Sequence, residues 1–242
     1  MKKRLLVGLG TGIFALCLTG MANAAPIDLS SWSQWGPANN GNWQVSADHT
    51  NVLQTINGNP TYFVSSVDYS NTIFNGSFGV ETTGDDDFIG FIFGATDSNN
   101  FFLFDWKQNT QTWSGTGEEG FTLSRVHGTD VNFWDHSGTD IDVLDTDYGS
   151  TKGWADNTSY DFTLDYTTSG ISIAIDGANI FALSGMSNNP DGKFGFYNYS
   201  QSYVRYQGFE QNPSSVPEPA TMLLFGSGLV GLAGFRRRKS NK

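Results

Sequence analysis

Two apolar runs decide the fold of this chain, Phe88-Ile89-Gly90-Phe91-Ile92-Phe93 and Phe101-Phe102-Leu103-Phe104-Asp105-Trp106. Each run has the length of a strand and is rich in the aromatic and β-branched residues that favour strands. Because apolar residues occupy both faces, we expect central strands that are covered on each side. The linking residues 94–100 are Gly, Asn, Asp and Ser in the main, which predicts a hairpin.

Further short strands surround this pair in the sequence. No stretch of ten residues shows a convincing 3.6-residue period, so helices should be few. The turn signals Asp176-Gly177 and Asp191-Gly192 fall between candidate strands and predict hairpins. The candidate strands are residues 160–166, 171–175, 179–183, 193–197 and 203–209. Many short strands without crossover helices predict an all-β fold, an antiparallel jelly-roll β-sandwich.

Charge is distributed unevenly along the 242 residues. Residues 25–216 hold five basic side chains against 23 acidic ones, a net charge of −18. A segment this acidic is repelled by phosphate backbones, which excludes nucleic acid as a partner. Cations are the expected binding partners. Aromatic residues make up 14% of the chain, which argues against intrinsic disorder.

The N-terminus has the features of a signal peptide. Basic residues at positions 2–4 precede an apolar stretch, and Ala22-Asn23-Ala24 is typical of a cleavage site for signal peptidase. We therefore expect export across the inner membrane and cleavage after Ala24. The one cysteine, Cys17, lies in the removed segment, so the mature chain should have no disulfide.

The C-terminus has the features of a second targeting signal. Val216, Pro217, Glu218 and Pro219 precede an uncharged run at 220–235, and a cluster of arginines follows. This order resembles the PEP-CTERM sorting signal of Gram-negative bacteria. The resemblance implies processing by an exosortase, a transient anchor formed by a short transmembrane helix at 220–235, and a cell-surface or extracellular destination associated with exopolysaccharide. Positive charge beyond the run would stay cytoplasmic, which places the acidic body outside.

The body itself resembles a known family. The stretch Asp85 to Gly94, followed by Phe102, Trp106-Lys107-Gln108 and Gln111-Thr112-Trp113, is similar to the signature of the thrombospondin C-terminal domain. Looser matches occur in order from residue 42 to residue 209. The resemblance implies a concanavalin A-like, L-type-lectin-like β-sandwich that binds calcium and acts in cell adhesion. The cysteines and the arginine linked with animal receptor binding are missing, so that recognition should not be carried over.

These features predict a domain organisation along the whole chain. It runs as signal peptide 1–24, lead-in 25–41, lectin-like sandwich 42–209, linker 210–216 and sorting signal 217–239.

Three consecutive carboxylates, Asp85, Asp86 and Asp87, stand just before the first apolar run. Their charges repel one another, so this placement is costly unless they are solvated or share a cation. Calcium takes six to eight oxygen ligands and is the natural candidate, with a solvated acidic turn as the alternative. A six-residue strand spans about 20 Å, so further ligands should come from other loops than residues 94–100.

Other acids are weaker candidates. Asp145-Thr146-Asp147 begins like an EF-hand loop, but Ser150 replaces the required glycine and no flanking helices are expected. A plain acidic loop is therefore favoured there over a second calcium site. Asp105 lies inside an apolar run, where Lys107, a backbone donor or a cation should satisfy it in a structural role.

Tryptophans in polar, glycine-rich surroundings could stack on sugar rings. Trp113, Trp134 and Trp154 are such residues, although core packing is the commoner role of a tryptophan in a sandwich. We select Trp134 and Trp154, with Asp135 and Asn157 beside them, as the candidate ligand-binding residues.

No catalytic pattern is recognisable. Glycosidases need two carboxyl groups about 5 to 10 Å apart, yet Glu118 and Glu119 are adjacent and would face opposite sides of a strand. The sequence therefore predicts no enzyme. It predicts an exported calcium-binding adhesion module that associates with exopolysaccharide or matrix proteins. The alternatives are a purely structural matrix protein and, less favoured, a sandwich-fold glycan-active enzyme.

Overall fold

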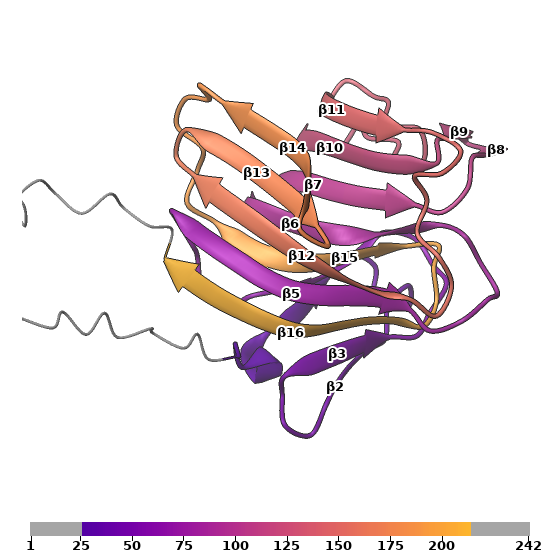
Figure 1. Ribbon diagram of the computed structural model, residues 1–242, viewed down its shortest axis with the longest axis horizontal. Coiled ribbons are helices and arrows are strands. Elements are labelled where there is room, and N and C mark those ends of the chain that lie inside the picture. The colour runs from indigo at the N-terminus through magenta and orange to yellow at the C-terminus, as the bar shows by residue number, and fades with distance from the viewer. Residues whose placement is uncertain (1–25, 214–242) are drawn as a thin grey trace, which may run out of the picture.

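Residues 26–213 are described by the computed structural model, and they form two seven-stranded antiparallel sheets packed face to face (Figure 1). The first sheet has the order β1 (Ser33–Trp35), β4 (Thr61–Val64), β15 (Lys193–Tyr199), β6 (Phe88–Asp97), β7 (Asn100–Lys107), β10 (Gly120–His127) and β11 (Ile141–Tyr148). The second has the order β14 (Ala178–Ser184), β13 (Gly170–Ile175), β12 (Ser159–Thr167), β5 (Thr72–Val80), β16 (Val204–Pro213), β3 (Asn51–Gln54) and β2 (Trp43–Val45).

Two small elements complete the described part. The hairpin of β8 (Gln111–Trp113) and β9 (Gly115–Gly117) forms a sheet of its own. A single 3-10 turn, η1, spans Leu29–Ser31. The predicted all-β antiparallel sandwich with few helices is confirmed.

The two apolar runs became the central strands β6 and β7, as expected. Phe91 pairs with Phe104 across them, and eight consecutive residues of β6 are buried. The later candidate strands correspond to β12, β13, β14, β15 and β16.

The two turn signals had different outcomes. Asp176-Gly177 joins β13 to β14, and both residues have positive φ, 49° and 76°, as a tight hairpin turn of this kind requires. Asp191-Gly192 was expected to form a hairpin too, but it connects β14 of the second sheet to β15 of the first. There Gly192 forms an isolated bridge with Tyr69 instead. A turn signal marks a chain reversal, and it does not fix which sheet the next strand joins.

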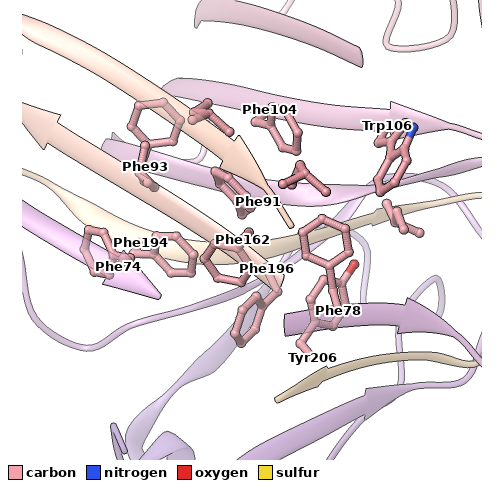
Figure 2. Close-up of a cluster of buried hydrophobic side chains, with 14 of the residues drawn as sticks. Phe74, Phe78, Phe91, Phe93, Phe104, Trp106, Phe162, Phe194, Phe196 and Tyr206 are labelled. Carbon is pink, nitrogen blue, oxygen red and sulfur yellow. The ribbon is translucent and has the colours of Figure 1, made fainter. Parts of the chain in front are cut away.

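The core between the sheets is built largely from aromatic rings (Figure 2). The ring of Phe91 lies 4.8 Å from Phe104 in its own sheet, 4.9 Å from Phe162 of the facing sheet and 5.6 Å from Phe194. Offset and edge contacts of this kind add about 0.5–1.5 kcal/mol per pair beyond the burial of area.

The outer face of the first sheet is also buried. Phe88, Ile92, Leu103 and Tyr197 project from it and form a second apolar cluster with Trp134. Trp134 belongs to the loop between β10 and β11, residues 128–140, which lies over this face. The loop explains why β6 and β7 are apolar on both sides.

The two ends of the sandwich carry different parts of the chain. In β16, Val204 pairs with Val80, and the last described residue, Pro213, pairs with Thr72 at the other end of β5. The connection from Val80 to Phe88 therefore leaves the sheet at the end opposite Pro213. We call the end with Asp85, Asp86, Asp87 and the β8–β9 hairpin the loop end; it lies to the right in Figure 1.

The sandwich extends beyond residues 42–209. Strand β1 lies in the segment expected to be a lead-in, yet it pairs with β4 in the first sheet. Strand β16 runs to Pro213, into the segment expected to be a linker. β1 has only three residues and no clear alternation, so its sequence carries a weak strand signal.

Candidate functional site

Three carboxylates gather at the loop end, where the chain returns from β5 to β6. The ligand atoms of Asp85, Asp86 and Asp87 lie within 4.8 Å of one another. Asp87 is buried and the other two are half-buried. The linker expected at 94–100 is shorter than predicted, because β6 runs to Asp97 and β7 begins at Asn100. The expected separation of the triplet from this turn is confirmed, since the ten residues of β6 span about 30 Å.

Neighbouring loops donate amide hydrogen bonds to this triplet. Asn57, between β3 and β4, donates to Asp85 through its Nδ2 atom. Asn109 donates to Asp86 at 3.2 Å, and Gln111 donates through Nε2 to the other Asp86 oxygen. The surroundings of the triplet thus come from loops distant in the sequence.

Lys107 is the cation that the fold itself places beside the triplet. It pairs with Phe88 across β6 and β7, so its side chain lies next to Asp87, and it is 0% exposed. Its Nζ atom lies 2.5 Å from an Asp87 carboxylate oxygen, 3.2 Å from the Asp86 carbonyl oxygen and 3.0 Å from Gln111 Oε1. These three acceptors use all three ammonium hydrogens. The ammonium also lies 5.0 Å and 4.7 Å from two ring centroids, those of Phe88 and Trp134.

The triplet keeps negative charge that Lys107 does not neutralise. Partial burial, together with the charge of Asp87, raises the pKa of Asp85 to about 6. Three ionised carboxylates and one ammonium leave a net charge of −2, which a divalent cation would balance. Carboxylate and amide oxygens are the ligands calcium prefers, so the residues present fit that ion. Asp85, Asp86 and Asp87 would hold it.

A surface pocket adjoins the triplet. It has a volume of about 460 Å³ and is lined by Gln111, Thr112, Trp113, Trp134 and Ser200. Trp113 is 70% exposed, and its ring meets that of Trp134 edge-on at 5.3 Å. Gln111 reaches Asp86, and Ser200 hydrogen-bonds Asn57, which in turn contacts Asp85. Two residues that line the pocket are therefore linked to the carboxylates by hydrogen bonds, Gln111 directly and Ser200 through Asn57.

The selected tryptophans lie at the loop end but are buried. Trp134 is 3% exposed and lies over Lys107, whereas Trp154 is 2% exposed and donates from its indole nitrogen to the Asp87 carbonyl oxygen at 3.0 Å. Asp135 is half-buried and accepts from Ser137 at 2.6 Å, and Asn157 is exposed. Their ligand-binding role stays a prediction. The exposed ring is that of Trp113.

Asp105 has a partner that the sequence did not indicate. Its carboxylate lies 2.7 Å from His136 Nε2, in the loop that covers the first sheet, and both residues are buried. Lys107, the partner suggested by proximity, turns to Asp87 instead. The structural, hydrogen-bonded role expected for Asp105 agrees with this geometry.

The other acids remain as loop and strand residues. The acidic loop favoured for Asp145-Thr146-Asp147 is wrong, because these residues lie on the edge strand β11. An EF-hand would require a loop between two helices. Asp140 accepts backbone hydrogen bonds from Thr129 and Asp130, which hold the pKa of its carboxyl below the usual value.

The terminal predictions lie outside residues 26–213. They include cleavage after Ala24, the motif Val216, Pro217, Glu218 and Pro219, and the segment 220–235. Within the described part, no helix is long and apolar enough to cross a membrane.

Comparisons of the sequence find two matches along the chain. Residues 38–212 match the thrombospondin C-terminal region, and residues 215–239 match the PEP-CTERM protein-sorting motif. Thrombospondin-1 of Xenopus laevis is 31% identical over 199 residues, covering 74% of this chain and 17% of that protein. Thrombospondin-4 of Bos taurus is 28% identical over 199 residues, 73% of this chain and 21% of that protein. The chain thus spans about a fifth of the length of these relatives.

Solved structures share the fold at low sequence identity. The exoplasmic/lumenal domain of VIP36 in its Ca2+/Man-bound form has a TM-score of 0.55 at 11% identity, covering 78% of this chain and 85% of that one. The carbohydrate-binding module CBM66 of Bacillus subtilis has a TM-score of 0.53 at 11% identity, covering 75% and 95%. The predicted lectin-like sandwich is confirmed.

Proposed function

Because the chain belongs to the thrombospondin C-terminal family, we propose that it is an exported adhesion module that binds an extracellular glycan with the help of calcium. The glycan belongs to the exopolysaccharide or matrix around the cell. Its binding region is the loop end, where the Trp113 pocket adjoins Asp85, Asp86 and Asp87.

The exposed ring of Trp113 beside the carboxylates is the observation that carries the proposal. A solvent-facing indole offers an apolar face on which a sugar ring can stack. Gln111, Thr112 and Ser200 add amide and hydroxyl groups around it, which suit hydrogen bonds with sugar hydroxyls. This pairing of an aromatic face with polar neighbours is typical of ligand pockets.

Calcium, when bound at the triplet, would supply a positive centre that orients hydroxyl or carboxylate oxygens of a ligand. The protein's own residues prepare that position. Lys107 holds Asp87 and Gln111 in place, and Trp154 fixes the Asp87 backbone through its carbonyl oxygen. Binding should be weak, because sugar hydroxyls exchange hydrogen bonds with water for hydrogen bonds with protein.

The PEP-CTERM motif at 215–239 supports export and surface display. We infer that signal peptidase removes residues 1–24, that the segment 220–235 anchors the chain transiently in the membrane, and that an exosortase then processes it. The mature domain would be displayed at the cell surface or released.

Binding without catalysis agrees best with the pocket. A glycosidase needs two carboxyl groups flanking the sugar, and the five residues that line this pocket carry none. A purely structural matrix role is the second candidate, and it would require Trp113 to be irrelevant to retention in the matrix.

The test is retention of the purified full chain on purified exopolysaccharide, together with a glycan array, in calcium and in chelator. We expect retention of the unmodified chain in calcium, and its loss in chelator and in Trp113→Ala. Val67→Ala is the matched control, because Val67 is also exposed but lies in the β4–β5 connection at the opposite end. Equal retention of Trp113→Ala would refute the pocket. No retention of the unmodified chain would refute glycan binding and favour the structural role.

A further inference from the structure

Gln111 joins the carboxylates to the Trp113 pocket. Its Oε1 atom accepts from Lys107 Nζ at 3.0 Å, and its Nε2 atom donates to Asp86. The two ends of the amide therefore face a cation and an anion. Only one orientation of the amide satisfies both partners.

The strand that begins at Gln111 also carries Trp113. Residues two apart on a strand face the same side, so both side chains project from one face of β8. The β8–β9 hairpin pairs with neither main sheet in the described part of the chain, so its position depends on side-chain contacts. Asn132 provides one such contact, donating to the Ser114 carbonyl oxygen at 2.6 Å.

A ring of contacts closes between the two sites. The ring of Trp113 meets Trp134 at 5.3 Å, and Trp134 in turn lies 4.7 Å from the Lys107 ammonium. Lys107 donates a hydrogen bond to Gln111, and Gln111 belongs to the same strand, β8, as Trp113. A movement of the Gln111 amide would therefore be transmitted to the solvent-exposed ring of Trp113.

A divalent cation on the triplet would disturb Gln111 directly. Asp86 is one of the three residues that would offer a carboxylate oxygen to the ion, and Gln111 Nε2 donates to that same carboxylate. The ion would compete with the amide for the charge of that carboxylate and repel the positive end of the amide. Rotating the amide would turn its NH2 group toward the Lys107 ammonium, which is also repulsive. Gln111 must then give up one partner and shift.

We propose that Gln111 is a coupling residue, through which occupancy of the triplet by a divalent cation sets the position of Trp113 and hence the shape of the pocket. This inference rests on the proposed function. It makes cation and glycan binding interdependent. A ligand bound at Trp113 changes the affinity for calcium by the same factor as calcium changes the affinity for that ligand.

The experiment follows Trp113 in the full chain with calcium alone as the probe. Acrylamide quenching of tryptophan emission is measured with and without calcium, and the signal of Trp113 is isolated by difference from matched Trp113→Phe proteins. Calorimetry records calcium binding in parallel. We expect calcium to shift the quenching of Trp113 in the unmodified chain, and this shift to be lost in Gln111→Ala and Gln111→Asn although calcium still binds.

Gln108→Ala is the matched control. Gln108 is a neighbouring glutamine whose side chain donates to Asp156 at 3.2 Å and accepts from Asn109 at 3.5 Å. It has no side-chain hydrogen bond with Lys107 or Asp86 within residues 26–213, so its variant should keep the shift. Calcium binding without any shift in the unmodified chain, or an equal shift in Gln111→Ala, would overturn the coupling and leave the proposed function standing. No calcium binding to the unmodified chain would overturn both.

Discussion

Replacing Asp85 by Asn should stabilise the calcium-free protein. An acid whose pKa is higher in the folded protein than in the unfolded chain stabilises the fold only while it is protonated. The pKa of Asp85 rises from 3.8 to about 6, because burial and the charge of Asp87 oppose its ionisation. Its contribution is therefore complete below pH 3.8 and is lost as the pH rises through about 6. At pH 7.5 the ionised side chain destabilises the fold.

The size of the effect follows from the same pKa. A rise of this extent corresponds to about 3 kcal/mol for a fully buried group. Asp85 is only half-buried, so solvent screens much of the repulsion and we expect about 1 kcal/mol. For a domain of this size that raises Tm by about 2–4 °C. The hydrogen bond from Asn57 survives only if the new amide presents its oxygen, which limits the gain.

Calorimetric melting of Asp85→Asn and of the unmodified chain, in chelator at pH 5 and pH 7.5, measures the effect. The gain should appear at pH 7.5 and shrink at pH 5. Asp161→Asn is the control for net charge, because Asp161 is exposed and its carboxylate has no hydrogen bond or ion pair among residues 26–213. In saturating calcium the order should reverse, since a hundredfold excess over Kd stabilises the unmodified chain by about 2.7 kcal/mol. An equal or lower Tm for Asp85→Asn in chelator at pH 7.5 would refute the electrostatic reasoning.

Three further outcomes follow from the structure. Lys107→Met should lower the free energy of unfolding by about 3–5 kcal/mol in urea titrations, because Asp87 keeps a buried charge without its partner; a loss below 1 kcal/mol would contradict that. Gly90→Ala should cost about 3 kcal/mol by the same assay, because a Cβ atom there would lie 2.0 Å from the Phe104 carbonyl oxygen, and an unchanged midpoint would show that the strands can separate freely. Mass spectrometry of secreted protein should find a chain that starts after Ala24 and lacks the C-terminal sorting motif, whereas an intact C-terminus would indicate simple anchoring.

The sequence predicted the central part of the fold because the signal there is local. β6 and β7 consist of apolar residues bounded by turn formers, and such a pattern has few alternatives to a buried strand. The side chains around the triplet required more than local pattern. Lys107 reaches Asp87 because it is paired with Phe88 across two strands, and that register cannot be inferred from either strand alone.

The tryptophans show the same limit. Trp113 and Trp134 have similar polar neighbours in the sequence, yet one is 70% exposed and the other 3%. The difference arises because residues 128–140 fold onto the outer face of the first sheet and carry Trp134 with them. Gln111 stood out in the sequence only as part of the family resemblance. Its contact with the triplet, like that of Ser200, could not be inferred, because these contacts depend on three loops meeting at one end.

The separation between Pro213 and the loop end has a consequence for avidity. A chain held at its C-terminal side would direct the Trp113 pocket away from the surface that holds it, at a distance of about 30 Å set by the length of β5 and its pairing with β16. Many copies displayed in this way would all face outward and could engage one polymer at several points. If the pocket binds a glycan as proposed, each weak contact would raise the effective concentration of the next, and a surface array would retain a polysaccharide that a single released copy would not.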